Sequence, residues 1–491
     1  MILAREQINR YLRHILIPEV SGPGQKKLLE SSVFICGETV KDTAAAIDYL
    51  AAAGVGRIEC QFNDNVGVEE LLAGIHDLND DVVIGVSDGS QCDFRIFLGR
   101  PEFILQKQEM ICNAFVPTVI SLFRSWTGGQ QIFRDSECLC SFMAALAEVQ
   151  QETGCEIPGE NIAGEIFSSC VLAALSALEV IKLSLTIGGV TDDFCYFNLL
   201  SMDFFKRGRA DLKHALIELC TPRQADVYES GLEDRKVLIV GAGGLGSPVA
   251  YALALAGVNT LGLVDYDTVE ISNLNRQILH TTSRIGIPKV ESAAVFLKHI
   301  NPGLSVILYN TSLSKENIFD IIADYDVVIV AVDNFPTRFL LNDACFFVGK
   351  PMIDAGVIRF DGTARTILPH KSPCYRCTLA AIPAAGTIPS CAESGVLGPV
   401  PGIMGFIQAA EAVKWVTGQG KLLSDSMLFF DGKYSEFVTI KLNKNPGCPL
   451  CGTNPAIHQL QEYGFQCEDA RNEEDKANKS NALSDCTLRC S

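Results

Sequence analysis

The 491-residue chain has few basic residues and no long apolar segment that is free of charge. Its 40 Lys and Arg residues stand against 58 Asp and Glu residues, and the net charge of −18 opposes sequence-independent binding to nucleic acid or anionic lipid. The most apolar segment, residues 166–187, contains Glu179 and Lys182, which favours a buried helix over a membrane span. Arg5 and Arg10 leave no apolar core for a signal peptide. We therefore expect a globular cytoplasmic protein with protein or small-molecule partners.

Disulfide bonds are also not expected, although 19 cysteines is a high count. Most of them stand singly inside apolar segments, as Cys36, Cys60, Cys170 and Cys345 do. In a reducing compartment such cysteines are small buried hydrophobic side chains.

A glycine-rich segment follows the apolar run 237–240 and precedes an alanine-rich one, which predicts a strand, a tight turn and a helix. The glycines of this turn are Gly241, Gly243, Gly244 and Gly246. Bare backbone amides at a helix N-terminus bind phosphate, and a Cβ there would block it. Asp265 ends the next apolar run, where a Rossmann unit places the carboxylate that binds a ribose hydroxyl. Glycine-rich turns also serve dehydrogenases and methyltransferases, so this pattern alone does not favour an ATP enzyme.

Five further residues favour ATP: Asn273, Arg276, Gln277, Lys289 and, after the apolar run 327–330, Asp333. Cleavage between the α- and β-phosphates needs cations around the leaving pyrophosphate and a carboxylate that holds Mg²⁺. Hydride transfer needs neither, so the NAD-binding oxidoreductase becomes the alternative.

These motifs resemble those of the ThiF/MoeB and ubiquitin-activating superfamily of adenylating enzymes. The resemblance covers residues 235–452 through GAGGLG, DYDTVEISNLNRQ, Lys289, AVDN, two CxxC pairs and CAESGVLGP. It implies that Asp265 holds the ribose of ATP, that Asn273, Arg276 and Lys289 bind the triphosphate, and that Asp333 coordinates Mg²⁺. Each residue taken alone could be a surface charge or a helix cap.

The first half of the chain repeats the second half without its polar motifs. The segment Val33 to Gly37 parallels Val237 to Gly241, and an Ala-Gly-Val triplet recurs at nearly the same spacing. Where the second copy has Gly243, Gly244, Gly246, Asp265 and Asp333, counting places Thr39, Val40, Asp42, Phe62 and Gly99 in the first. A β-branched residue and an acid in the turn would exclude and repel a nucleotide.

The repeat predicts an α/β protein of two tandem Rossmann-like doubly wound sheets that form an internal pseudo-dimer. We expect a nucleotide-free repeat in residues 1–222, an active ATP-binding repeat with a zinc site in residues 223–452, and a polar, mobile tail in residues 453–491. An unrelated α/β domain in the first half is the alternative, and higher oligomers stay open. The tail cysteines Cys467, Cys486 and Cys490 suggest no role.

One motif of the first repeat is retained, the segment RYLRH at residues 10–14. In the family that the chain resembles, an N-terminal RYxRQ helix inserts its second arginine into the ATP site of the partner subunit. The resemblance implies this role for Arg13, with His14 replacing the glutamine. An ordinary helix-surface cation is the alternative.

Two cysteine pairs, Cys374–Cys377 and Cys448–Cys451, are each flanked by proline or glycine. Four thiolates in such tight turns favour a closed tetrahedral Zn²⁺ site, with an iron–sulfur or redox centre as the alternative. The family carries zinc at these positions.

Cys391 lies in a loop of small residues and proline, and the resemblance implies that it accepts an acyl group or takes part in sulfur transfer. A spectator role stays open, since some relatives finish with adenylation. The segment from Cys377 to Gly398 is too short for the separate cysteine domain of large ubiquitin activators, and we expect no ubiquitin-fold recruitment domain.

We therefore predict ATP-dependent adenylation of the C-terminal carboxylate of a small ubiquitin-like sulfur carrier protein, with acyl or sulfur transfer if Cys391 is used. A ribosomally made peptide with a free C-terminus is the alternative substrate, and a non-catalytic scaffold is the alternative role.

Overall fold

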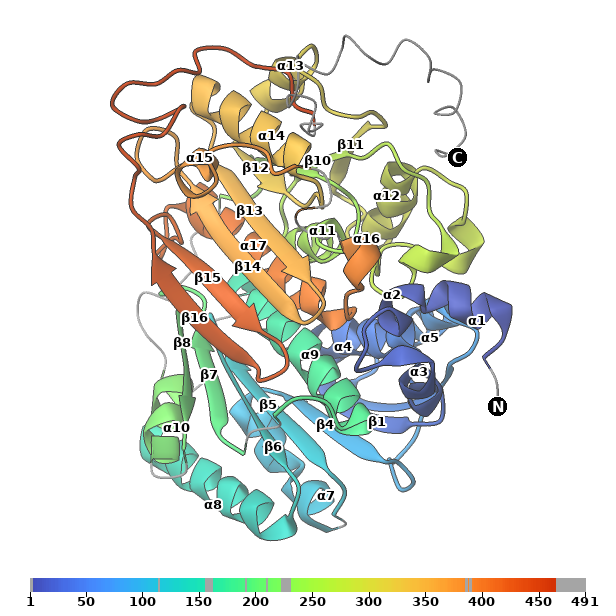
Figure 1. Cartoon of the computed structure of the whole chain (residues 1–491). Helices are drawn as coiled ribbons and strands as arrows, with labels where there is room; N and C mark the ends of the chain where they lie inside the picture. The colour runs from blue at the N-terminus through green and yellow to red at the C-terminus, as the bar shows by residue number, and fades with distance from the viewer. Residues whose placement is uncertain are drawn as a thin grey trace, which may run out of the picture.

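The chain folds into two sheets, one in each half (Figure 1). The computed structural model describes residues 3–113, 115–154, 162–189, 192–208, 211–221, 231–384, 387 and 391–464. The strands of the first half are β1 (Ser32–Thr39), β2 (Arg57–Asp64), β3 (Val83–Val86), β4 (Phe94–Gly99), β5 (Thr118–Arg124), β6 (Thr127–Phe133), β7 (Phe194–Asn198) and β8 (Asp203–Arg207). Its helices are α1 (Arg5–Arg10), α2 (Leu12–Ile15), α3 (Ser21–Leu29), α4 (Val40–Ala53), α5 (Val68–Leu78), α6 (Pro101–Gln106), α7 (Gln108–Asn113), α8 (Ser136–Thr153), α9 (Ile162–Leu185) and α10 (Leu212–Cys220).

The second half repeats this succession of elements. Its strands are β9 (Lys236–Val240), β10 (Thr260–Val264), β11 (Ser305–Tyr309), β12 (Val327–Val330), β13 (Met352–Ile358), β14 (Asp361–Ile367), β15 (Ser426–Asp431) and β16 (Glu436–Lys441). Its helices are α11 (Gly246–Leu255), α12 (Lys289–Ile300), α13 (Ile318–Ala323), α14 (Phe335–Val348), α15 (Tyr375–Thr378), α16 (Cys391–Ser394) and α17 (Pro399–Thr417), with 3₁₀ turns η3 (Ile271–Asn273) and η4 (Thr282–Arg284).

The two sheets have the same strand order, β3-β2-β1-β4-β5-β6-β7-β8 and β11-β10-β9-β12-β13-β14-β15-β16. In each sheet the first five strands are parallel and the last three are antiparallel. The equal order confirms the predicted tandem doubly wound fold. In the second sheet the order reverses between β9 and β12, and ligands of such folds bind at the carboxyl ends of the strands at this point.

The two repeats share one hydrophobic core, which is built from α4 and α9 of the first repeat and α11 and α17 of the second. Tyr49 of α4 packs edge-on against Phe406 of α17, with ring centroids 6.5 Å apart. Helix α9 is long and apolar enough to cross a membrane, but 89% of its most apolar window is buried inside the protein. It is the central core helix of the pseudo-dimer, as its interrupting charges predicted.

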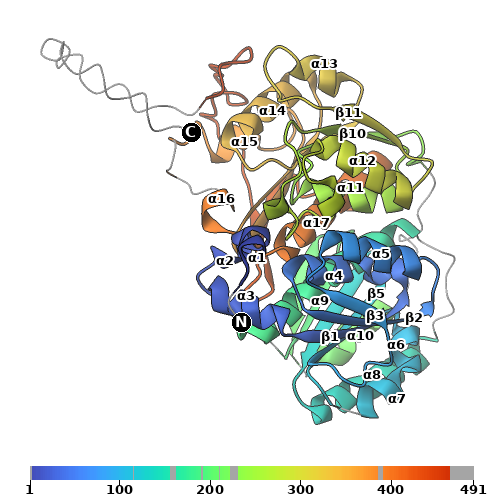
Figure 2. The same ribbon diagram turned by 90° about the vertical axis from the view of Figure 1, so that its right-hand side faces the viewer.

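The N-terminal helices α1 and α2 belong to the first repeat in sequence but lie against the second repeat (Figure 2). The Asn275 side-chain amide donates a 2.6 Å hydrogen bond to the backbone carbonyl of Arg10. The Arg10 guanidinium bridges the repeats, since it donates to the Leu78 carbonyl at 2.7 Å and to the Thr282 hydroxyl at 3.1 Å. These bonds fix the place at which Arg13 enters the second repeat.

Residues 453–464, which the sequence assigned to the tail, pack against the second repeat. Ile457 is buried, and the Tyr463 hydroxyl donates a 2.7 Å hydrogen bond to the carboxylate of buried Asp343 in α14. The expected boundary at residues 222 and 223 and the cysteines Cys467, Cys486 and Cys490 lie outside the described residues.

Candidate active site

The glycine-rich turn connects β9 to α11, as the sequence predicted. Gly241 has φ of 101°, in the region that favours glycine, and a Cβ there would lie 2.6 Å from the Ala331 carbonyl oxygen. A Cβ on Gly246 would lie only 1.8 Å from the Gly241 carbonyl oxygen. Glycine at these two positions therefore lets the turn close tightly before α11.

The Asp265 carboxylate holds this turn from the end of β10. Its Oδ2 accepts a 2.7 Å hydrogen bond from the Ala242 amide, and its Oδ1 accepts one of 2.9 Å from the Asp267 amide. Burial raises the pKa of Asp265, while Lys289 and these two amides oppose the rise. Buried Lys289 lies with its Nζ 2.8 Å from Asp267 Oδ2. A cation and two carboxylates thus face the same space.

The segment that follows Asp267 is folded back on itself by its own side chains. Asn273 is buried, and its Oδ1 accepts a 3.1 Å hydrogen bond from the Glu270 amide. The Arg276 guanidinium donates to the Ser272 carbonyl at 2.8 Å and to Asn275 Oδ1 at 3.0 Å. These bonds hold the Arg276 side chain beside the glycine turn.

One cavity of about 650 Å³ gathers the predicted nucleotide-site residues. Its lining includes Arg13, Gly241, Gly243, Gly244, Asp265, Asn273, Arg276, Gln277, Lys289 and Asp333. Gly246 is not in the lining, because it is buried at the start of α11, where it shapes the turn from behind. The cavity lies at the carboxyl ends of β9 and β12, the switch point of the sheet.

Arg13 reaches this cavity from the first repeat, and its neighbour His14 locks the helix in place. The Gly398 amide donates to His14 Nε2 at 3.3 Å, so Nδ1 carries the proton and donates to Gln25 Oε1 at 3.2 Å. Burial lowers the pKa of His14 to about 4. The Val396 amide also donates to the Arg13 carbonyl at 3.2 Å. His14 is therefore a neutral structural link between the repeats.

The corresponding junction of the first repeat has no glycine turn, because β1 runs through Thr39 and α4 begins at Val40. Thr39 caps α4 and donates a 2.7 Å hydrogen bond to Asp42. Burial raises the pKa of Asp42 to about 6. Arg100 pairs with Glu38 at 3.4 Å and with Glu165 at 2.8 Å. Side chains and three acids thus occupy the place where phosphate would bind.

The strand registers correct one predicted equivalence. Val33 pairs with Phe94 in the first sheet as Val237 pairs with Val327 in the second. Six residues further along each chain stand Arg100 and Asp333, so Arg100 takes the place of the predicted Mg²⁺ ligand and Gly99 does not. The count from sequence was wrong by one residue because the connections that follow these strands differ in length.

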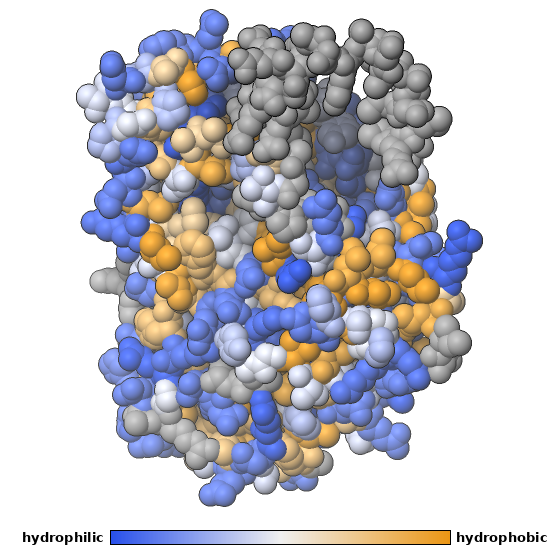
Figure 3. Space-filling model, in the orientation of Figure 1, coloured by the Kyte–Doolittle hydropathy of each residue, from blue (hydrophilic) through white to orange (hydrophobic). Residues whose placement is uncertain are grey.

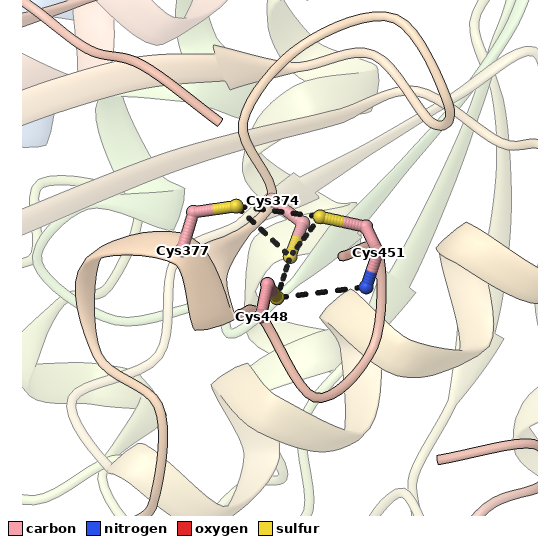
Figure 4. A group of neighbouring side chains, drawn as sticks. All are labelled: Cys374, Cys377, Cys448 and Cys451. Atoms are coloured by element: carbon pink, nitrogen blue, oxygen red, sulfur yellow. Dashed lines mark hydrogen bonds between the residues drawn. The ribbon is translucent and has the colours of Figure 1, made fainter. Parts of the chain in front are cut away.

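The four paired cysteines converge on one point (Figure 4). The sulfurs of Cys374, Cys377, Cys448 and Cys451 all lie within 4.8 Å of one another. Four sulfurs at a Zn–S distance of about 2.3 Å in a tetrahedron lie about 3.8 Å apart, so this set fits such an ion. Burial raises the pKa of Cys448, but the amides of Cys451 and Leu450 outweigh it, and the pKa is below its ordinary value.

The cysteine cluster lies next to the nucleotide cavity. Tyr375 and Thr378, in and beside the first cysteine pair, line that cavity. The cluster therefore fixes part of the cavity wall.

Cys391 begins α16, which packs against α2 and β13 (Figure 2). Its side chain lies outside the described residues. The loop that follows reaches the nucleotide cavity, since Val396 lines it and the Gly395 carbonyl accepts a 3.1 Å hydrogen bond from the Arg359 amide. The Cys391 segment thus contacts the same helix that carries Arg13.

Sequence reasoning missed a buried charged group in the cavity lining. Arg338 of α14 pairs with Asp354 of β13 and donates to the Ala355 carbonyl at 2.7 Å, while Arg365 lies 3.6 Å from Asp354. All three residues line the cavity and are buried. Asp354 is an acid inside an otherwise apolar strand, and that signal could have found the group.

These features define a tandem α/β protein in which the second repeat carries the cavity that gathers the predicted nucleotide-site residues and the first repeat places Arg13 in its lining. A model of the ThiF family matches residues 223–450. The "SAMP-activating enzyme E1" of Haloferax volcanii is 46% identical over 217 residues, which are 44% of this chain and 80% of that protein. A "Sulfur carrier protein adenylyltransferase" of Thermus thermophilus is 40% identical over 255 residues, 51% of this chain and 94% of that protein. The chain belongs to the ThiF family.

Longer relatives match as well. The "Adenylyltransferase and sulfurtransferase MOCS3" of Mus musculus is 44% identical over 232 residues, 47% of this chain and 50% of that protein. The chain thus spans about half the length of this relative. A crystal structure of E. coli MccB with MccA aligns with a TM-score of 0.40 at 24% identity, over 45% of this chain and 67% of that one.

Proposed function

We propose that this protein activates the C-terminal carboxylate of a small ubiquitin-like sulfur carrier protein by adenylation. The observation that carries the proposal is the single cavity in which Arg13 of the first repeat meets the glycine turn, Asp265, Lys289 and Asp333 of the second. The printed names of the relatives, an activating enzyme and a sulfur carrier protein adenylyltransferase, support this substrate class.

The groups in the cavity suit adenylate formation. A carboxylate oxygen of the carrier attacks the α-phosphorus of ATP, and the bond from that phosphorus to pyrophosphate breaks. The carboxylate is ionised at neutral pH, so no general base is required. The charge that develops on the leaving pyrophosphate is neutralised by Arg13, Arg276 and Lys289. Because these side chains are held in position beforehand, they need not reorganise during the reaction.

Two metal sites accompany this chemistry. Asp333 would hold Mg²⁺, which screens the phosphates and withdraws charge from the leaving group. The four cysteines would hold a structural Zn²⁺, which adds folding free energy. Helix α15, which lies between the first two cysteines and beyond, supplies part of the cavity wall through Tyr375 and Thr378.

An exposed apolar face next to the cavity suits the folded part of the carrier. Phe429 pairs with Val438, and Met427 pairs with Ile440, so the four side chains share one face of β15 and β16. Phe429, Val438 and Ile440 are 38%, 53% and 48% exposed, while Met427 lines the nucleotide cavity. Figure 3 shows apolar side chains gathered over these strands, on the left of the view. A carrier on this face could extend its C-terminus into the cavity.

Cys391 would then accept the acyl group. Its thiolate would attack the acyl carbon of the adenylate, forming a thioester and releasing AMP. A Cys391→Ser variant should keep carrier-dependent exchange of pyrophosphate into ATP but lose a reductant-sensitive adduct with the carrier. Full turnover by Cys391→Ala would instead show that adenylation is the only step on this chain.

The proposed reaction is tested by incubating the purified protein with ATP, Mg²⁺, labelled pyrophosphate and a ubiquitin-like carrier that ends in Gly-Gly. Adenylate formation is reversible, so label should enter ATP only when the carrier is present. A carrier without its last two residues is the matched control. Exchange that does not depend on the intact carrier would contradict the proposal.

A further inference from the structure

A second cavity, of about 240 Å³, lies at the seam between the repeats and shares no lining residue with the nucleotide cavity. Its walls come from β6, β7, β8 and α9 of the first repeat and from β16 and the preceding turn of the second. Strands β8 and β16 lie side by side here (Figure 1). A water molecule occupies about 30 Å³ in the liquid, so the cavity has room for a small organic molecule.

Two buried polar atoms in the lining have no hydrogen-bond partner within the described part of the chain: Glu179 Oε2 and Gln130 Nε2. Glu179 is 2% exposed and Gln130 is 4% exposed. The other oxygen of Glu179 accepts hydrogen bonds from Lys182 at 2.7 Å and from the Ser435 hydroxyl. The carboxylate charge is thus compensated, but one acceptor and one donor are left without a partner, which is costly in a protein interior.

The second repeat has a different set of contacts at the equivalent carboxylate. Its Glu411 pairs with Lys414 as Glu179 pairs with Lys182, and its second oxygen accepts from the Thr366 hydroxyl and from the Leu423 amide at 2.8 Å. Strand register places Ile132 in the first repeat where Thr366 stands in the second. The first repeat therefore lacks this hydroxyl donor, and Ile132 lines the cavity together with Glu179.

The remaining walls carry aromatic side chains together with Asp193 and the Lys206–Glu436 ion pair, whose charged atoms lie 3.3 Å apart. Phe204 of β8 stacks on Phe437 of β16, with ring centroids 4.5 Å apart and planes 22° apart, and Phe197 lies beside them in the lining. Aromatic walls favour a planar occupant. The acceptor Glu179 Oε2 and the donor Gln130 Nε2 together suit a molecule with an N–H group next to a carbonyl group. The carboxylate of Glu179 repels an anion.

We propose that this seam cavity binds a small, neutral, planar aromatic amide or lactam, whose N–H donates to Glu179 Oε2 and whose carbonyl accepts from Gln130 Nε2. Because both repeats contribute walls, an occupant stabilises the packing of one repeat on the other. The site is separate from the nucleotide cavity, and it stands or falls independently of the adenylation proposal.

The test uses benzamide as the probe and the full-length protein, with saturation-transfer NMR and thermal unfolding as readouts. We expect saturable binding with a Kd below about 10 mM, as suits nine heavy atoms, and a rise in Tm with benzamide concentration. Benzoate, of the same shape with a carboxylate, should not bind.

Two variants locate the binding. Gln130→Met removes the amide donor and should weaken benzamide binding about five- to tenfold while leaving the Tm of the unliganded protein equal or higher. Ile132→Phe fills the cavity and should abolish binding. A cooperative thermal transition and an unchanged circular dichroism spectrum report that both variants are folded. Absence of saturable binding to wild type, or binding that neither variant changes, would overturn the proposal.

Discussion

The two repeats have the same strand order and the same pairing pattern, yet they differ completely where the first strand meets its helix. In the second repeat five residues, ending in Leu245, separate β9 from α11 and form an open turn. In the first repeat α4 follows β1 directly, and Thr39, Asp42 and the Arg100–Glu38 pair occupy that region. The comparison teaches that one framework tolerates two different connections at this point, and on our proposal these few loop residues decide whether a nucleotide binds.

The first repeat, which we propose to be inactive, contributes to the cavity of the second. Its N-terminal helices place Arg13 in the nucleotide cavity of the other repeat, and His14 and Arg10 anchor them there. Its α4 and α9 complete the common core. The first repeat is thus a structural partner that places one of its side chains in the lining of the second repeat's cavity.

The largest expected difference between the repeats comes from removing the charged residue at the same position of each, Asp333 in the second repeat and Arg100 in the first. Asp333→Ala should reduce carrier-dependent pyrophosphate exchange by at least about 10³-fold, because the proposed Mg²⁺ ligand is lost. Arg100→Ala, at the equivalent position of the first repeat, should leave exchange per folded molecule unchanged. Comparable losses in both variants would mean that both repeats take part in phosphate chemistry.

Loss of the proposed zinc site should lower the unfolding free energy, whereas loss of a cysteine in the first repeat should not. Cys374→Ser should abolish the binding of one zinc per chain and lower the unfolding free energy by more than about 4 kcal/mol, the range typical of a lost metal site. Cys140→Ser, at an exposed position in α8 of the first repeat, is the matched control and should change neither. Mass spectrometry for metal and denaturant titration measure the two quantities. A chain with iron, or without metal, would refute the zinc assignment.

Arg13→Ala tests whether the active site spans both repeats. Exchange should fall about 10²–10³-fold while ATP affinity changes little, because the guanidinium acts on charge that develops in the transition state. Arg5→Ala, at an exposed site in α1, should match wild type. Steady-state kinetics and ATP titration make the distinction, and an unchanged rate in Arg13→Ala would confine the site to the second repeat.

The contact made by His14 should weaken in acid. Its pKa is about 4 in the folded protein and 6.5 when solvent-exposed, so the unfolded chain binds more protons between these values. The unfolding free energy that His14 contributes should therefore decrease as pH falls from 6.5 to 4, by at most about 3 kcal/mol.

Asp48 acts in the opposite direction, because burial raises its pKa to about 7. As pH falls, protonation of Asp48 in the folded protein increases the unfolding free energy. The total unfolding free energy therefore does not isolate the effect of His14. The measurement is the difference in unfolding free energy between wild type and His14→Gln across this range. A difference that does not vary with pH would contradict the assignment of neutral His14.

Sequence patterns predicted the fold, and they named residues that the structure brings together in one cavity, because the relevant signals are local. The glycine turn, Asp265 and the cysteine pairs are recognisable from spacing, and the structure brings each to its expected place. The Arg338–Asp354 pair was not found, because its members come from different elements that only tertiary packing unites. Gly99 was mistaken for Arg100 because strand register is fixed by pairing and not by counting along loops.

The central claim is that one repeat binds ATP and the other does not, and the most direct test is a calorimetric titration of the protein with a non-hydrolysable ATP analogue in the presence of Mg²⁺. The account predicts one nucleotide per chain, with affinity reduced at least about tenfold by Lys289→Ala, which removes a buried cation from the cavity. Two nucleotides per chain, or one whose affinity is unchanged by Lys289→Ala, would contradict it.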